Sequence, residues 1–529
     1  MKRRFAETAM MFLAVAGIAT DARAQNSARS YPPDLKNYAR PIAPGEVRPL
    51  RSARTLSPLV VTPTVVDAVV NNTDATLKNT DTFNDGEVSI AVDPLNVNRI
   101  VMTAFSSSWG ATAALWLSTN GGSTWTKEFS INPPPGAAGL AGCPCDQTID
   151  FGHSAPLAAA FLSYNPNNVY SARSSALTSA TGAFSFFTVG GVAQAVNHLG
   201  APGSNVDQPW LLVGPGPSHM AGMRLAKTEN VYVAYDDFGT GGDDGGPTVA
   251  GSGTGITEFP MRVAVATATD PLRFTVDNSD GNGTGYVNPG HRLAIDPRSG
   301  VVYGLFQRRI KPGDGGSQNI DYMLNRSTDY GKTWRLNGSS TGIIVANADS
   351  TQPQPKFCTV NALLGGADHA AVDPVTGDVV YVYGSRDSTT HNDRLALRRL
   401  TPNASGGLDI GSEHFVTGQV VAAIPSVAIA ANRTIGVFYY TCDDTAGYPT
   451  FSAHFSTSTD LGASFTDRVL ETFHSPATDD GNDTQRVLGD YMQVKTVGNT
   501  FFGGFTGNGV PFGRSFSNND PIFFKLSAQ

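Results

Sequence analysis

The chain has 529 residues and a formal net charge of −8, with 40% hydrophobic and 16% charged residues. This composition supports a sizeable folded core and excludes a disordered chain. The charge balance shows no basic excess, so no nucleic-acid partner is expected. The 57 glycines and 33 prolines are typical of many strands joined by tight turns.

The N-terminus has the features of an export signal. Lys2, Arg3 and Arg4 precede the short apolar run "AMMFLAVAGIA", and "ARA" before Gln25 fits a small-residue cleavage site. The pattern predicts a signal peptide over residues 1–24 and a periplasmic or secreted mature protein; an uncleaved anchor is the alternative. No later stretch reaches the roughly 18 apolar residues of a membrane span.

Residues 25–84 form a predicted extended N-terminal arm, rich in Pro, Ser, Thr and Asn, with one apolar run, "PLVVTPTVVDAVV". A loose repeat then occupies residues 85–529. Each unit contains an apolar strand, a turn and a second apolar strand, and no segment keeps a helical period. The seven units begin "EVSIAVDP", "QTIDFGHS", "QPWLLVGP", "HRLAIDPR", "HAAVDPVT", "PSVAIAAN" and "DYMQVKTV".

Repeats of this size predict an all-β fold, a β-propeller, in which stacked blades bury faces that no single blade can bury alone. Ring closure also removes exposed sheet edges. Seven blades are favoured, with six as the alternative. The final run "PIFFKLSAQ" could complete the last blade together with a strand from the N-terminal arm.

One turn pattern occurs three times, as "STNGGSTW" from Ser118, "STDYGKTW" from Ser327 and "STDLGASF" from Ser458. We expect each to follow the second strand of its unit. The Asp or Asn would accept hydrogen bonds from the turn, the Gly would adopt a positive φ, and the aromatic ring would pack on strands. These structural positions are Asn120, Gly122, Trp125, Asp329, Gly331, Trp334, Asp460, Gly462 and Phe465.

This pattern is the Asp-box, and on these motifs residues 85–529 resemble the sialidase-like (BNR-repeat) propeller superfamily. The resemblance implies a propeller whose Asp-boxes lie on the face opposite the active site. It also implies a possible Tyr nucleophile assisted by an acidic residue, an Asp acid/base, and three arginines around a substrate carboxylate. The Arg-Ile-Pro motif of sialidases is absent; "VMTAFSSS" stands in its place.

Alignment of the seven first strands predicts which residues meet at one mouth of the channel. One aligned column contains Ser89, Thr148, Trp210, Arg292, His369, Ser426 and Tyr491. The preceding column contains Val88, Gln147, Pro209, His291, Asp368, Pro425 and Asp490, with Glu87 and Asp146 one residue earlier. Loops after the second strands add Asp236, Asp237, Arg308, Arg309, Arg386, Asp387, Asp443 and Asp444. Such convergence predicts a polar ligand site.

Within that mouth the resemblance implies exo-glycoside hydrolysis of the sialidase type on carbohydrate or a glycoconjugate. Tyr491 would be the nucleophile with Glu87 as its partner, and Asp490 and His369 complete the predicted catalytic set. The expected substrate-binding residues are Arg292, Arg309, Arg386, His291, Trp210 and Asp236.

Two other functions fit the same residues. A non-catalytic propeller would bind a glycan or a protein at this mouth, with Trp210 as a stacking platform. A polysaccharide lyase would abstract a proton beside a uronate carboxylate, using His291, His369 or Tyr491 with Arg292. Each histidine has the simpler interpretation of a hydrogen-bonded inner-strand residue.

The cysteines and acidic loops indicate no cofactor. "CPC" at Cys143 and Cys145 is too tight for an easy internal bridge, so pairing with Cys358 or Cys442 is considered. The loops "DNSDGNGTG" from Asp277 and "TDDGNDT" from Thr478 are calcium-like but lack EF-hand spacing, which leaves structural calcium a weak prediction. The oligomeric state is not predicted.

Overall fold

A computed structural model describes most of the repeat region and a short part of the arm. The predicted signal peptide, Cys143 and the "TDDGNDT" loop lie outside the described residues. The described residues are 62–73, 86–105, 109–137, 144–153, 156–163, 167–174, 177, 184–198, 206–216, 228–237, 260–269, 271–282, 291–312, 317–350, 356–361, 368–416, 421–446, 449–475, 487–514 and 518–528.

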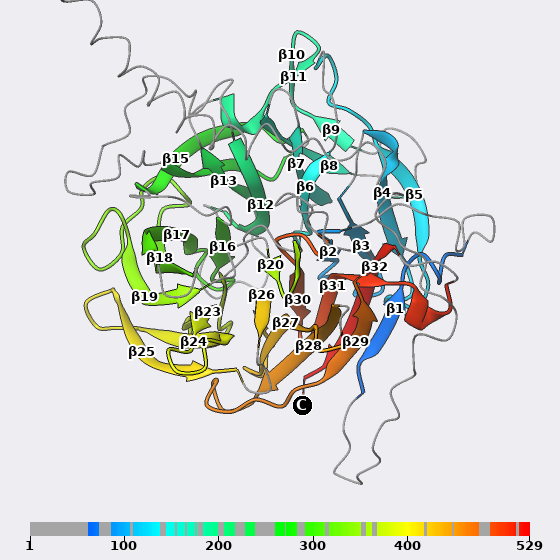
Figure 1. The fold of residues 1–529 in the computed structure, drawn as a ribbon. Coiled ribbons are helices and arrows are strands. Elements are labelled where there is room, and N and C mark those ends of the chain that lie inside the picture. The colour runs from blue at the N-terminus through cyan, green and yellow to red at the C-terminus, as the bar shows by residue number, and fades with distance from the viewer. Residues whose placement is uncertain are drawn as a thin grey trace, which may run out of the picture.

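Seven four-stranded antiparallel sheets form a ring around a central channel (Figure 1). Each sheet is one blade, and its first strand in the order below lies innermost. The seven-bladed β-propeller is therefore confirmed, and six blades are excluded. The described residues contain no α-helix and no helix long and apolar enough to cross a membrane.

The first four blades contain the seven-residue and longer strands expected from the apolar runs, together with shorter ones. Their strands are β2 (Ser89–Val92), β3 (Ile100–Thr103), β4 (Gly110–Ser118) and β5 (Thr126–Ile131); β6 (Cys145–Asp150), β7 (Leu157–Ser163), β8 (Asn168–Ser174) and β9 (Phe184–Phe186); β12 (Val206–Pro215), β13 (Glu229–Asp237), β14 (Pro260–Thr267) and β15 (Phe274–Asn282); and β16 (Arg292–Ile295), β17 (Val302–Pro312), β18 (Gln318–Ser327) and β19 (Ile343–Ser350).

The last three blades follow the same order from the channel outward. They contain β22 (Asp368–Val372), β23 (Val379–Arg386), β24 (Asp393–Pro402) and β25 (Leu408–Phe415); β26 (Ala422–Ile429), β27 (Ile435–Asp443), β28 (Thr450–Ser458) and β29 (Val469–His474); and β30 (Gln493–Val497), β31 (Thr500–Asn508), β32 (Asn519–Ser527) and β1 (Thr64–Asp67). Two small hairpins, β10 (Thr188–Val189) with β11 (Val192–Ala193) and β20 (Lys356–Phe357) with β21 (Val360–Asn361), and 3-10 turns at Val196–His198 and Val510–Phe512 complete the described elements.

The last blade joins both ends of the described chain. β1 comes from the N-terminal arm and pairs antiparallel with β32, with Val66 opposite Phe523. The final run and the arm thus close the ring together, as the sequence suggested. Because β1 is the outer strand of that blade, it covers an edge that β32 would otherwise expose.

Alternation along the strands supplies an apolar face to each neighbouring blade. In β27, Phe438 and Tyr440 belong to the apolar cluster shared with blade seven, whereas Val437 and Tyr439 belong to the cluster shared with blade five. Successive side chains of a strand point to opposite sheet faces, which explains this division. The core is therefore a set of layers between blades rather than one central mass.

The three repeated turns share one hydrogen-bond pattern. In the second, the Thr333 N–H donates to Asp329 Oδ1 at 2.8 Å, and the Gly331 N–H donates to Ser327 Oγ at 2.8 Å. Gly331 has a φ of +82°, and Trp334 is buried. The predicted turn physics is confirmed, but each turn follows the third strand of its blade rather than the second, because the sequence repeat did not reveal that strand.

A disulfide joins two cysteines that the sequence left open. Cys358, between β20 and β21, bonds to Cys442 near the end of β27, with 6.1 Å between their Cα atoms. The idea that Cys143 or Cys145 pairs with either of them is therefore wrong. Cys145 is itself disulfide-bonded and not a free thiol. The bridge fixes the β20–β21 hairpin to the sixth blade.

Candidate functional site at the channel

A ring of hydrogen bonds links the inner strands and shows how they align. The backbone N–H groups of Ile149, Leu211 and Val427 donate to side chains of the preceding blade, at Ser89 (3.0 Å), Thr148 (3.2 Å) and His369 (3.3 Å). Val494 donates to Ser426 at 3.0 Å, and Ile90 donates to Gln493 at 3.2 Å. Side-chain acceptors at one level thus connect neighbouring blades.

The ring corrects one position of the sequence alignment. Val494 and Ile90 place Gln493, rather than Tyr491, at the level of Ser426 and Ser89. Tyr491 precedes β30 and lies two residues closer to the mouth. The sequence alignment matched apolar residues, whereas this level is defined by hydrogen-bond acceptors.

Two positions of this level carry side chains that cannot accept such bonds, Trp210 in blade three and Arg292 in blade four. The Arg292 guanidinium lies over the Trp210 ring, with Cζ 4.6 Å from the centroid, and 5.3 Å from the Tyr491 centroid. The Trp210 and Tyr491 rings are 5.8 Å apart and nearly perpendicular. Residues from three blades therefore meet in the channel, where the regular pattern is broken.

Three successive blades have a left-handed residue just before this level. The φ angles are +54° at Glu87, +43° at Asp146 and +51° at Gln208. In blades two and three a register shift falls at the same place, between Cys145 and Thr148 and between Asp207 and Trp210. Bulges of this kind re-aim side chains and concentrate near functional sites.

Gln208 connects the cation of the site to a carboxylate. Its Oε1 accepts a hydrogen bond from Arg292 Nη2 at 3.2 Å, and its Nε2 donates to Asp490 Oδ2. Asp490 is fully buried, and its Oδ1 has no hydrogen-bond partner among the described residues. Asp490 is thereby held close to Arg292 with one oxygen uncommitted.

Three acidic side chains converge on Tyr491. Burial raises the pKa of Tyr491 well above its usual value, and the charges of Glu87, Asp146 and Asp490 raise it further, while Arg292 lowers it. The phenol donates a hydrogen bond to the Gln147 carbonyl at 3.2 Å. Tyr491 and Glu87 are brought together as the sequence predicted, but the environment favours the neutral phenol over the phenolate.

Asp368 supplies a carboxyl group of a different character. Burial raises its pKa, although hydrogen bonds from Tyr381 and Gln307 and the charge of Arg292 act in the opposite direction. A buried carboxyl with a raised pKa can hold a proton at higher pH than an exposed one. We call Glu87, Asp146, Gln208, Trp210, Arg292, Asp368, Asp490 and Tyr491 the channel cluster.

The two predicted histidines lie beside this cluster. His369 Nδ1 accepts from the Val427 N–H, and the ring packs edge-on against Trp210 with centroids 5.4 Å apart. Burial lowers the pKa of His369 to about 3, so its imidazole is neutral at ordinary pH. His291 Nδ1 lies 3.5 Å from the Tyr235 carbonyl. Both histidines therefore have the hydrogen bonds of inner-strand residues.

The predicted arginines are not brought to one point by the described contacts. Arg386 pairs with Asp393 of its own blade, with 3.5 Å between Nη1 and Oδ2. Arg309 lies in β17, and its side chain is outside the described part of the chain. Asp236 is buried in β13, opposite Asp207 of β12. Only Arg292 of the predicted three is placed in the channel by a described contact.

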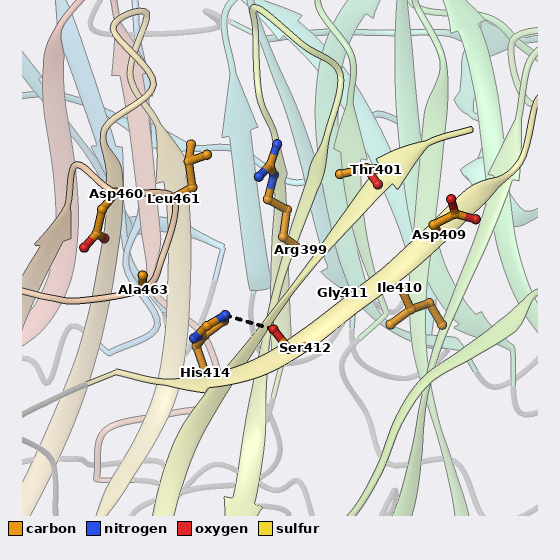
Figure 2. A pocket seen from close by; sticks show the side chains of 10 residues that line it. All are labelled: Arg399, Thr401, Asp409, Ile410, Gly411, Ser412, His414, Asp460, Leu461 and Ala463. Carbon is orange, nitrogen blue, oxygen red and sulfur yellow. Dashed lines mark hydrogen bonds between the residues drawn. The ribbon is translucent and has the colours of Figure 1, made fainter. Parts of the chain in front are cut away.

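A cavity of about 310 Å³ lies away from the channel, between β24 and β25 of blade five and the repeated turn of blade six (Figure 2). Its polar groups serve local structure. Arg399 binds Asp378, Asp460 accepts from the Ser464 N–H, and His414 contacts Ser412. This rim cavity is therefore a weaker candidate for chemistry than the channel cluster.

The described residues contain no group of three His, Cys, Asp or Glu side chains arranged to hold a metal ion. The first part of the calcium-like stretch, Asp277–Asn282, belongs to β15 and is not a loop. The backbone there pairs with β14, which a metal-binding loop would not do. Structural calcium stays an untested prediction.

Sequence reasoning missed three members of the cluster as site residues: Asp146, Gln208 and Asp368. Asp146 and Asp368 stood in the aligned strand starts, so their acidic character beside an inner strand was an available signal. Gln208 had no comparable signal, because a glutamine before a strand is common and its bulge is not visible in the sequence.

No protein family and no curated protein matches the sequence. Among solved structures, a protein of unknown function from Dyadobacter fermentans is 12% identical and covers 88% of this chain and 99% of its own, with a TM-score of 0.41. The α-L-arabinofuranosidase Arb93A of Fusarium graminearum (13% identity, 82% and 92% covered, TM-score 0.38) and the α-L-arabinanase of Penicillium chrysogenum (11%, 84% and 96%, 0.39) also match. At these values the likeness carries no argument about activity, and the fold rests on the blades themselves.

Proposed function

We propose that this chain is an exported glycoside hydrolase whose active site is the channel cluster. The observation that carries the proposal is the pairing of unlike carboxyl groups beside one cation. Asp368 has a raised pKa and senses the charge of Arg292, while Asp490 is tied to Arg292 through Gln208. Glycosidases use one carboxyl group as acid and a second as base or nucleophile.

In this mechanism Asp368 donates its proton to the glycosidic oxygen as the bond from that oxygen to the anomeric carbon breaks. The carboxylate of Asp490 assists attack on the anomeric carbon. Glu87 and Asp146 add negative charge, which stabilises the positively charged sugar of the transition state. Tyr491 acts as a neutral hydrogen-bond donor rather than as a nucleophile, because its acidic neighbours disfavour the phenolate.

The lyase alternative is less well supported by the same contacts. A histidine base needs an unprotonated ring nitrogen that can reach the substrate. His369 already uses Nδ1 to accept from Val427, and its low pKa makes it a weak base. A Tyr491 base would need the phenolate that the cluster disfavours.

A non-catalytic binding propeller is the second candidate, and one observation favours it. Tyr491, Arg292 and Asp490 are at most 3% exposed, so a ligand reaches them only if covering groups move. Such burial is also what an inert polar plug would have. The difference between the candidates is therefore turnover, not shape.

The test is hydrolysis of a panel of aryl glycosides by the purified mature protein and by Asp368→Asn, Asp490→Asn and Tyr491→Phe variants. Asp490→Asn should lower kcat/KM by at least about 100-fold on every substrate. Asp368→Asn should lose most on poor leaving groups and little on dinitrophenyl glycosides, which need no acid. Asp409→Asn, a neutralised surface carboxylate in β25, is the matched control and should retain activity.

Loss of activity in Asp409→Asn, or full activity in Asp490→Asn, would overturn the assignment. Unsaturated product from uronate polysaccharides would move the function to a lyase. Absence of turnover together with measurable glycan binding would favour the binding propeller.

A further inference from the structure

The described part of the channel cluster carries an excess of negative charge. Its acidic side chains are Glu87, Asp146, Asp368 and Asp490, and its one cation is Arg292. His369 beside it is neutral. Even with a proton on Asp368, the acids outnumber the cation.

Arg292 is also poorly placed to bind a substrate carboxylate. Its Nη1 donates to the His291 carbonyl at 3.1 Å, and its Nη2 donates to Gln208 at 3.2 Å. Its two planar faces contact Trp210 and Tyr491. A two-point grip on a carboxylate needs two parallel N–H groups of one guanidinium edge, and both terminal nitrogens are already engaged here.

No second described arginine compensates for this. Arg386 is bound to Asp393 within blade five, and Arg308 is bound to Asp321 within blade four. A buried anion requires a cationic partner, because its desolvation is otherwise too costly. An acidic sugar would meet several carboxylates at this site and one occupied guanidinium.

We infer that the channel cluster accepts neutral sugars and rejects sugars that carry a carboxylate, such as sialic acids and uronic acids. The inference rests on the proposed function for its site and deepens it by naming the substrate class. Negative charge that repels an anionic sugar would stabilise the oxocarbenium-like transition state of a neutral one. The same groups thus favour hydrolysis and select against acidic substrates.

The experiment compares sugars that differ only in charge. Aryl glucoside is paired with aryl glucuronide, and aryl galactoside with aryl galacturonide. Neutral aryl furanosides and an aryl sialoside complete the panel. Binding of the corresponding free sugars to the full protein is measured by calorimetry. We expect kcat/KM or affinity for a neutral sugar to exceed that for its acidic counterpart by at least about tenfold.

The Asp146→Asn variant sharpens the test. Removing one carboxylate should raise the acidic-to-neutral ratio severalfold, whereas Asp409→Asn at the rim should leave the ratio unchanged. Equal or better use of acidic sugars overturns the inference while hydrolysis stands. Binding of neutral sugars without turnover overturns hydrolysis while the inference stands. A protein that neither binds nor cleaves any neutral sugar overturns both.

Discussion

The guanidinium of Arg292 lies over the indole of Trp210, with Cζ 4.6 Å from the ring centroid, and both side chains are buried. The two residues occupy neighbouring blades at the level where the others are joined by side-chain hydrogen bonds. A cation stacked on an aromatic ring in a dry site is stabilised by about 2 kcal/mol. The contact thus links blades three and four where the hydrogen-bond ring is interrupted.

Replacing Arg292 with lysine should weaken this junction although the charge is kept. Lysine lacks the planar group that stacks between Trp210 and Tyr491 and cannot bridge His291 and Gln208 in the same way. We expect a loss of about 2 kcal/mol in unfolding free energy and a changed tryptophan fluorescence. Arg399→Lys at the rim is the control; an equal effect there would contradict a special role for Arg292.

Gly489→Ala should disturb the site through Glu87. Gly489 has a φ of +88°, and an added Cβ would collide with Cγ of Glu87. Glu87 cannot move freely, because its N–H donates to Thr506 Oγ1 at 3.1 Å. We expect at least about tenfold lower kcat/KM with a reduced melting temperature. Gly498→Ala also has a positive φ but open space, so it should affect stability only.

Glu471 should make stability depend on pH. Burial raises its pKa well above the usual value, so its contribution is full below the unfolded pKa and is lost as pH rises through the folded one. Glu471→Gln keeps an acceptor for the Asn508 N–H and removes the ionisation. Urea unfolding should show a gain of roughly 1–3 kcal/mol at pH 8 and little change at pH 4. A pH-independent difference would contradict this explanation.

The buried tyrosines should resist ionisation until the protein unfolds. Burial is the largest cause of the raised pKa of Tyr322, Tyr381, Tyr440 and Tyr491. Their contribution to stability is present below the unfolded pKa near 10 and is lost as pH rises above it. Tyrosinate absorbance should therefore lag behind that of the urea-unfolded chain and rise abruptly on alkaline unfolding. A smooth titration of every tyrosine near pH 10 would show that these rings are accessible.

The Cys358–Cys442 bridge should stabilise the sixth blade and the hairpin attached to it. Phe357 of that hairpin stacks on Phe451, with ring centroids 5.8 Å apart. Replacing both cysteines with serine should cost about 2–4 kcal/mol. A melt of the double variant with and without reductant measures it. The variant should be insensitive to reductant at this bridge, and unchanged stability would show that packing alone holds the hairpin.

The fold was predictable because its signals are local and repeated. Seven strand pairs and three turns with Ser327-type spacing are visible in the sequence, and ring closure follows from them. The third strands were hidden, since their residues alternate less regularly, and this misplaced the turns by one strand. Strand β1 was recognisable only as an apolar run in the arm, since its partner β32 lies at the other end of the chain.

The site was predictable in part. Acidic and aromatic residues before the inner strands, such as Glu87 and Tyr491, could be selected by position, and they do meet. The level of Gln493 was missed by two residues because a bulge or irregular start shifts register without changing composition. Partnerships across the channel, such as Gln208 with Arg292 and Asp490, depend on ring geometry that no local pattern encodes.

The pairing of β1 with β32 also has a kinetic meaning. β1 is synthesised before any blade, yet its only described strand partner is the last strand made. Blades one to six can assemble in sequence, but the seventh must wait until the whole chain is available. Until then an unpaired strand edge stays exposed at the ring opening and could capture another chain. Assembly should therefore end in one late, cooperative step that joins the two termini, and this step is where misassembled dimers would arise.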